Sequence, residues 1–155
     1  MVAAGLIGGC VSYAPPERTL DDAAGIERAG EPQRELLLRA LSLVGVPYRY
    51  GGQSPDTGFD CSGLVQYLYN EVWGLALPRR AQDMSRVGSA VGHHELTAGD
   101  LVFFDTLREP YSHVGIYLGN HKFVHAPSSG GRVEVVVMTD RYWVRRYNGA
   151  RRVAY

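Results

Sequence analysis

The chain has 155 residues, of which 45% are hydrophobic and 21% charged, and its sixteen basic residues balance sixteen acidic ones. This length and composition predict one globular domain with a hydrophobic core of its own. The zero net charge excludes a global field that would recruit nucleic acid or a membrane surface, so we expect no nucleic-acid partner. No apolar stretch approaches the ~20 residues that a transmembrane helix needs.

The first ten residues are small or apolar and end at Cys10. Ile7-Gly8-Gly9-Cys10 is similar to a bacterial lipobox, in which the cysteine becomes lipidated. Because no Lys or Arg precedes Cys10 and the apolar run is short, we interpret residues 1–10 as a truncated or atypical lipoprotein signal. A lipid on Cys10 would exclude a disulfide with Cys61 and would be the chain's only link to a membrane. Val11 follows where an Asp would indicate inner-membrane retention, so we expect an outer-membrane anchor on the periplasmic face of the envelope.

Residues 11–31 contain a Pro-Pro pair, scattered charges and no sustained periodicity, which predicts a flexible tether. A short helix around 20–28 is the alternative. The globular domain is expected over residues 32–155. It begins with an amphipathic helix that ends before Gly45 and Pro47, and the apolar face of this helix consists of Leu36, Leu37, Ala40, Leu41 and Val44.

A turn-rich segment at 48–59 leads into a second predicted helix, which starts at Cys61. Its apolar positions follow the i, i+3, i+4, i+7 spacing of one helix face: Cys61, Leu64, Val65 and Leu68. Asp60 can cap this helix by accepting a bond from a free backbone N–H. The helix dipole at that end favours thiolate over thiol, and thiolate is the nucleophilic form. Cys61 is therefore either a catalytic cysteine or one of the buried, inert cysteines that are common in proteins.

The rest of the chain predicts a shorter helix at 79–84 and then a change of period. Five segments have the composition of strands and are separated by Gly, Asn, Pro and Ser, namely 101–105, 113–118, 122–126, 132–138 and 152–155. Gly119-Asn120 is a turn signal that makes the second and third of these a hairpin. Helices followed by antiparallel strands predict an α+β fold, with N-terminal helices packed on a sheet of about five to six strands.

Two histidines on the predicted hairpin favour the catalytic interpretation of Cys61. Alternation places His113 on the face of its strand that points away from an apolar stripe. In a paired hairpin, His125 would lie beside His113 and could hydrogen-bond its ring. A helix start packed against this sheet would then bring together nucleophile, base and orienting group in the order Cys61, His113, His125.

The same three residues are also suitable zinc ligands. They are widely separated in the chain, and no C-x-x-C or H-x₃₋₅-H pair is present to nucleate a structural site. We therefore predict no metal and no cofactor. Activity that survives a chelator and is lost to iodoacetamide would distinguish the thiol from a metal.

Six short motifs occur in order along the chain. They are Tyr48-Arg-Tyr-Gly-Gly52, Phe59-Asp-Cys-Ser-Gly-Leu-Val65, Leu77-Pro-Arg79, Ala98-Gly-Asp-Leu-Val-Phe-Phe104, His113-Val-Gly-Ile-Tyr117 and Val124-His-Ala126. Together they resemble the NlpC/P60 family of cell-wall cysteine peptidases from about Gln33 to the C-terminus, and in particular its small lipoprotein members. The resemblance implies a papain-like α+β fold and hydrolysis of amide bonds in peptidoglycan stem peptides.

The resemblance also implies catalytic roles for the three residues already singled out. Cys61 would be the nucleophile, His113 the base and His125 the third polar residue. A tetrahedral intermediate needs preorganised donors for its oxyanion, and we expect the backbone N–H of Cys61 and the hydroxyl of Tyr50 to provide them.

Substrate contacts are expected around the nucleophile. The resemblance suggests that Asp60 and Ser62 touch substrate, although Asp60 can equally act as a helix cap, or do both. Arg79 or Arg80 could clamp a carboxylate of D-Glu or diaminopimelate through a bidentate fork. Arg80 and Met84 stand where relatives often carry Thr and Gln, which could alter these contacts.

The sequence leaves the scissile bond open. It is either D-Ala–diaminopimelate in a cross-link or γ-D-Glu–diaminopimelate within a stem, and the loops that shape the pocket decide between them. Residues 108–111 lengthen one of these loops. A non-catalytic peptidoglycan-binding module and a related acyl-transfer or toxin enzyme are the alternative functions. We expect a monomer whose partners are peptidoglycan stem peptides.

Overall fold

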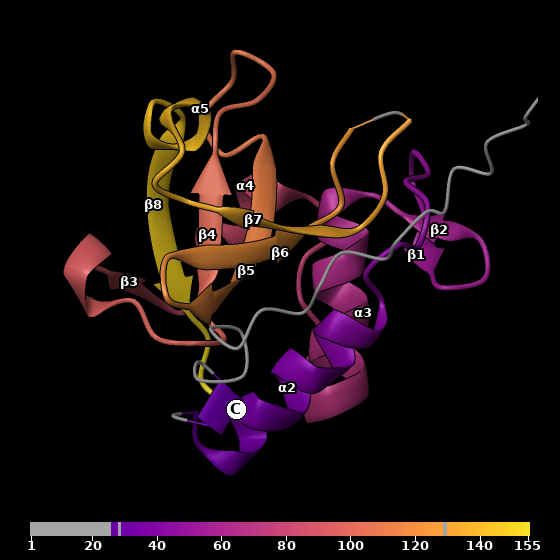
Figure 1. The fold of residues 1–155 in the computed structure, drawn as a ribbon, viewed down its shortest axis with the longest axis horizontal. Coiled ribbons are helices and arrows are strands. Elements are labelled where there is room, and N and C mark those ends of the chain that lie inside the picture. Colours follow the sequence, from indigo (N-terminus) through magenta and orange to yellow (C-terminus); the bar gives the residue numbers. More distant parts are fainter. Residues whose placement is uncertain (1–25, 28, 129) are drawn as a thin grey trace, which may run out of the picture.

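The computed structural model describes residues 26–27, 29–128 and 130–155. The predicted lipoprotein signal, Cys10 and most of the predicted tether lie outside these residues. Helices α2 (Glu31–Ser42) and α3 (Cys61–Trp73) lie on one side of the described domain and the antiparallel sheet on the other (Figure 1). The α+β prediction is confirmed. Within the described ranges, no helix combines the length and apolar character required to cross a bilayer.

The two long helices begin and end close to the predicted signals. Helix α2 spans Glu31–Ser42, with a proline in its first turn, and Gly45 follows it with a φ of 96°. Helix α3 spans Cys61–Trp73; Asp60 caps its start and Gly74, in the left-handed region, terminates it. The helix expected at 79–84 is shorter than predicted. The remaining helices are α4 (Ala81–Met84), the 3-10 helix η1 (His93–Glu95) and α5 (Arg141–Val144).

The main sheet has six strands in the spatial order β3, β8, β4, β5, β6, β7. Their bounds are β3 Ser89–Val91, β4 Leu101–Phe104, β5 His113–Gly119, β6 Lys122–His125, β7 Glu134–Val137 and β8 Tyr147–Arg152. A small separate ladder pairs β1 (Gln53–Ser54) with β2 (Gly58–Phe59). The predicted hairpin is confirmed: Asn120 and His121 connect β5 to β6 with φ values of 49° and 58°, as a two-residue hairpin turn requires.

One strand was predicted at the wrong place. We expected 152–155, where Val153 and Tyr155 are apolar, but β8 covers Tyr147–Arg152 and lies inside the sheet between β3 and β4. Its sequence lacks an alternating apolar pattern, so the strand was not recognisable. A charged residue is tolerated at its end because Arg152 forks onto the carboxylate of buried Asp100, with N–O distances of 2.8 and 2.7 Å. The short edge strand β3 was also not predicted.

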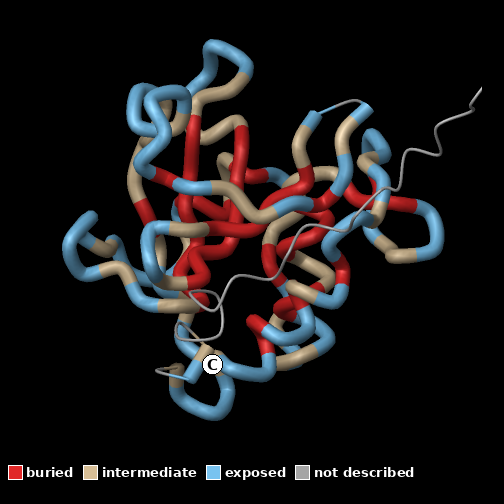
Figure 2. Tube along the Cα trace, viewed as in Figure 1, coloured by how far each residue is buried: buried red, intermediate tan, exposed pale blue. Residues whose placement is uncertain are grey.

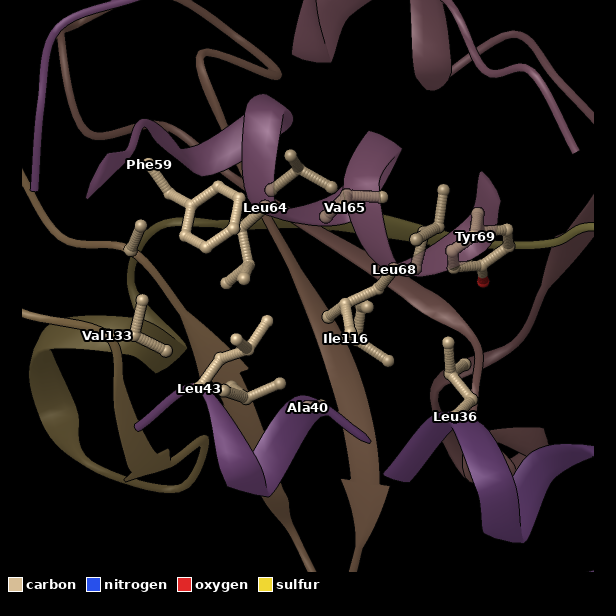
Figure 3. Close-up of a cluster of buried hydrophobic side chains, with 14 of the residues drawn as sticks. Leu36, Ala40, Leu43, Phe59, Leu64, Val65, Leu68, Tyr69, Ile116 and Val133 are labelled. Atoms are coloured by element: carbon tan, nitrogen blue, oxygen red, sulfur yellow. The ribbon is translucent and has the colours of Figure 1, made fainter. Parts of the chain in front are cut away.

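Apolar side chains cover both faces of the sheet. On one face, Leu64 and Leu68 of α3 point toward α2 and toward Ile116 of β5 (Figure 3). Figure 2 shows the buried residues along the central strands and on the facing sides of α2 and α3. The opposite face, which the sequence had not assigned to a core, carries a second buried cluster: Val102, Phe104, Tyr117, Phe123, Met138 and Ala150. His113, which we expected on the face that points away from the apolar stripe, is therefore buried as well.

Candidate active site

Asp60 organises the start of α3. Its Oδ1 accepts the backbone N–H of Gly63 at 2.7 Å, which confirms the predicted N-cap, and its Oδ2 accepts the N–H of Gly51 at 3.1 Å. The turn that contains Gly51 and Gly52 therefore packs directly against the first turn of α3. A β-carbon at Gly63 would overlap the carbonyl oxygen of Gly52, and one at Gly52 would overlap that of Gly58, so close backbone packing explains both glycines.

The side chain of Arg79 binds the capping residue Asp60. Its guanidinium forks onto both carboxylate oxygens of Asp60 at 3.0 and 2.5 Å and donates to Ser62 Oγ at 2.6 Å. The structure thus brings Asp60, Ser62 and Arg79 together, but as partners of one another. Arg80, the other candidate clamp, is exposed and donates to Gln82 Oε1 at 2.7 Å. Met84, which we considered for substrate contact, is completely buried in the core.

Cys61 is the first residue of α3, as predicted, and is half-buried. The backbone N–H groups of Val114 and Ser62 hydrogen-bond its sulfur. Val114 directly follows His113 at the start of β5, so the thiol lies against the strand end that carries the predicted base. The packing of α3 on β5 creates this juxtaposition between residues far apart in the sequence.

The two predicted histidines form a buried pair. His113 Nε2 lies 2.8 Å from His125 Nδ1, and their side chains are among the buried polar groups of the domain. This confirms the expected hydrogen bond between neighbouring strands of the hairpin. The rings meet edge to face, with centroids 4.9 Å apart.

The sequence analysis did not identify two neighbours of this histidine pair. Trp143 of α5 stacks on His113 at 5.9 Å and meets His125 edge-on at 5.0 Å, which covers the pair with an apolar ring. Glu134 of β7 places Oε1 3.2 Å from His125 Nε2. Neither residue belongs to a motif: Trp143 follows a turn, and Glu134 begins a valine-rich strand.

The expected oxyanion donor Tyr50 is 90% exposed. Tyr48, two residues earlier, is half-buried and packs against the cluster that also contains Cys61. Burial raises the pKa of the Tyr48 hydroxyl, and the neighbouring Asp60 and Cys61 raise it further. Tyr48 is therefore the tyrosine that lies near Cys61, whereas Tyr50 is exposed to solvent.

Burial opposes charge on both members of the Cys–His pair. It raises the pKa of the Cys61 thiol and outweighs the N–H groups of Val114 and Ser62, which lower it. Burial also lowers the pKa of His113 to about 4 and that of His125 to about 3, the latter with help from His113. Burial therefore outweighs the preference for thiolate that we expected from the helix dipole, and the resting site holds a thiol and neutral imidazoles at neutral pH.

These shifts predict acid sensitivity of the fold. Both histidines stay neutral in the folded protein down to pH 5, whereas each takes up a proton near pH 6.5 after unfolding. Their stabilisation is complete above pH 6.5 and is lost as pH falls toward the folded pKa values. We expect the free energy of unfolding to decrease by about 2 kcal/mol per histidine between pH 7.5 and 5. Urea unfolding between pH 7.5 and 5 measures this decrease in the free energy of unfolding. His125→Gln should remove about half of the decrease. If the free energy of unfolding of this variant depends on pH as strongly as that of the wild type, His125 does not cause the effect.

Comparison with known proteins agrees with this geometry. The chain matches the NlpC/P60 family over residues 45–152, which contain Cys61, His113 and His125. It is 48% identical over 133 residues to murein DD-endopeptidase MepS/murein LD-carboxypeptidase of Escherichia coli K12, covering 86% of this chain and 69% of that protein. It is 45% identical over 118 residues to murein DD-endopeptidase MepH of the same strain, covering 74% of this chain and 44% of MepH.

A crystal structure of an NLP/P60 family protein from Staphylococcus aureus, described as similar to a lipoprotein, has the same fold. Its TM-score is 0.73 at 38% identity, and the match covers 82% of this chain and 43% of that one. The chain thus spans less than half the length of MepH and of the staphylococcal protein. The match over 45–152, the identity to MepS and the shared papain-like α+β architecture show that this chain belongs to the NlpC/P60 family.

Proposed function

We propose that the chain is a cysteine peptidase that hydrolyses amide bonds of peptidoglycan stem peptides. One observation carries the proposal: the thiol of Cys61, at a capped helix start, is bonded by the N–H that follows His113, and His113 is paired with His125. This is the arrangement of nucleophile, base and orienting group that acyl transfer requires. The printed names of MepS and MepH, both murein endopeptidases, support peptidoglycan as the substrate.

The mechanism follows from the neutral resting pair. Cys61 Sγ attacks the scissile carbonyl carbon and forms the C–S bond while the thiol proton passes to His113. Because Nε2 of His113 faces His125, Nδ1 is the ring atom that accepts this proton. His113 then protonates the leaving nitrogen as the C–N bond breaks. Water that the same imidazole deprotonates hydrolyses the thioester and regenerates the thiol.

The oxyanion that forms during attack needs donors, and we assign this role to the Cys61 backbone N–H and to Tyr48. Removing one such donor typically lowers kcat by about 10²–10³. We therefore expect Tyr48→Phe to reduce kcat by roughly that factor. Tyr50→Phe is the matched control and should change kcat little, because Tyr50 is exposed. Steady-state kinetics on one muropeptide compare the two variants, and equal losses would contradict the assignment to Tyr48.

The names of the two Escherichia coli relatives support a D-Ala–diaminopimelate cross-link as the bond that this chain cuts. The test incubates the full chain with a cross-linked muropeptide dimer and, separately, with an uncross-linked tripeptide muropeptide. Mass spectrometry should show monomers released from the dimer and an intact tripeptide. Cleavage of the tripeptide between D-Glu and diaminopimelate would instead support the other bond. If both substrates remain intact, the peptidase proposal fails and a binding module remains.

Sensitivity to reagents separates a thiol from a metal-dependent hydrolase. Among the residues that the structure describes, no three His, Cys, Asp or Glu side chains gather as metal ligands. We propose that no metal takes part in the reaction. Activity should survive a chelator and disappear after alkylation with iodoacetamide; the reverse pattern would overturn the cysteine mechanism.

We further propose that residues 11–31 tether the catalytic domain at 32–155 to a lipid on Cys10, at the periplasmic face of the outer membrane, and that the protein is a monomer. The lipobox-like sequence before Cys10 supports the anchor, and the murein relatives support the cell envelope. Cys10→Ala should move the protein from the membrane fraction to the soluble fraction. Unchanged fractionation would exclude the anchor.

A further inference from the structure

Glu134 lies at the end of a relay of side chains that starts at Cys61 and continues through His113 and His125. It is the first residue of β7, and the register of β6 and β7 places it directly opposite His125. Its Oε1 lies 3.2 Å from His125 Nε2, on the far side of the ring from the contact with His113. About half of the Glu134 side chain reaches solvent, so the carboxylate connects a buried imidazole to the surface.

Aromatic rings cover the faces of this relay. Trp143 stacks on His113 and meets His125 edge-on, and Phe123 packs against His125 at 5.2 Å. Polar partners can therefore reach His125 only through the edge of its ring. Within the described part of the chain, Nε2 of His125 has no well-aligned hydrogen bond, and Oε1 of Glu134, 3.2 Å away, is within hydrogen-bonding distance of it.

A hydrogen bond at this position fixes the protons of both rings. A carboxylate only accepts, so His125 must carry its proton on Nε2 and present the lone pair of Nδ1. That lone pair accepts the Nε2–H of His113 across the observed 2.8 Å contact. His113 is then left with a lone pair on Nδ1, which is the form that can take a proton from a thiol. With the opposite tautomer of His125, the Nδ1–H would face His113 and the base would be protonated on the wrong nitrogen.

We propose that Glu134 is a positioning residue that sets the tautomers of His125 and His113, and that the relay is Cys61, His113, His125, Glu134. Glu134 acts through the histidines and does not touch the reacting atoms. The inference rests on the proposed function, in which Cys61 is the nucleophile and His113 the base. The negative charge of Glu134 also stabilises the imidazolium that forms when His113 takes the thiol proton.

Two substitutions and a control test this assignment in the full-length chain. Glu134→Val removes the acceptor and suits a strand that continues with three valines, and Glu134→Gln keeps the shape but can also donate. Glu71→Gln is the matched control, because it removes the same charge from an exposed position on α3. Nitrogen-15 NMR of the imidazoles should show His113 and His125 protonated on Nε2 in the wild type and in Glu71→Gln. Glu134→Val should show a mixture of tautomers.

Kinetics provide the second readout. Replacing the buried carboxylate of a Ser-His-Asp triad costs about 10⁴ in kcat. Glu134 is half-exposed and one ring further from the chemistry, so we expect a loss of roughly tenfold in kcat with little change in KM. The acid limb of the pH–rate profile should move to lower pH, because loss of a nearby negative charge lowers the pKa of the base His113, which must be neutral to accept the thiol proton. A purely structural role would not change the tautomers or this limb.

The outcomes also separate this inference from the proposed function. Alkylation of Cys61 by iodoacetamide needs no peptidoglycan, and it should slow several-fold in Glu134→Val at neutral pH. If alkylation and tautomers change but the wild type cuts no muropeptide, the relay stands and the proposed function fails. If the wild type cuts muropeptides and Glu134→Val matches Glu71→Gln in tautomers, alkylation and kcat, the role of Glu134 is refuted.

Discussion

Cys61→Ala should abolish hydrolysis of muropeptides while the fold stays intact. Removing a nucleophile takes away every step of the covalent mechanism, and losses on the order of 10⁴-fold or more in kcat are typical. The substitution removes only one sulfur atom from a half-buried position, and the cap on Asp60 does not depend on it. Mass spectrometry of the released fragments measures the activity, and urea unfolding measures the fold.

Cys10→Ala is the matched control for the nucleophile experiment, because it removes the other cysteine of the chain. This variant, assayed in detergent, should cut at the rate of the wild type. Cys61→Ser adds a further comparison, since the hydroxyl can keep the bonds to the backbone N–H groups but is a much weaker nucleophile beside a neutral imidazole. Fragment release by Cys61→Ala at the wild-type rate would show that the nucleophile lies elsewhere.

Asp60→Ala should have the second-largest effect and should reduce both stability and activity. The side chain caps α3, binds the N–H of Gly51 and holds the guanidinium of Arg79. Loss of an N-cap costs about 1 kcal/mol. Breaking a well-formed ion pair adds to this, but Arg79 is about one-third exposed and solvent partly compensates it. We expect a total decrease of roughly 2–4 kcal/mol in the free energy of unfolding.

Asp60→Asn separates the cap from the charge. The amide oxygen can still accept the N–H of Gly63, whereas the amide nitrogen cannot accept from Arg79. This variant should retain the contribution of the cap, about 1 kcal/mol of the stability that Asp60→Ala loses, and Arg79 should become free to bind other anions. Urea unfolding and kcat/KM for both variants measure the two roles. Equal stability losses in Asp60→Ala and Asp60→Asn would mean that the ion pair, and not the cap, is the main contribution.

The sequence predicted those parts of the site that depend on local signals. Asp60 before an apolar helical pattern specified the cap and the position of Cys61, because capping acts within one helical turn. The turn signal at Gly119-Asn120 specified the hairpin, and the hairpin placed His125 beside His113. The positions of Cys61, His113 and His125 were therefore predictable, since each is positioned by its own element or by a neighbouring strand.

Other features depend on segments that meet only in the folded chain. Arg79 was expected to bind substrate, but the fold turns its fork onto Asp60. Tyr48 and Tyr50 are equivalent in sequence, and only the packing of the loop turns Tyr48 toward Cys61. Strand β8 has no apolar alternation, and its place inside the sheet is defined by its pairing with β3 and β4, where Arg152 meets the carboxylate of Asp100.

By itself, the sequence determined the family, the fold class and the three residues of the proposed catalytic set, because these are encoded in contiguous motifs and in the periods of single elements. The tertiary structure decided the electrostatic state of the site. Trp143 and the second apolar cluster bury the histidines and keep them neutral, and the register of β7 brings Glu134 to His125. Burial and register are properties of the assembled sheet, which no single stretch of the chain specifies.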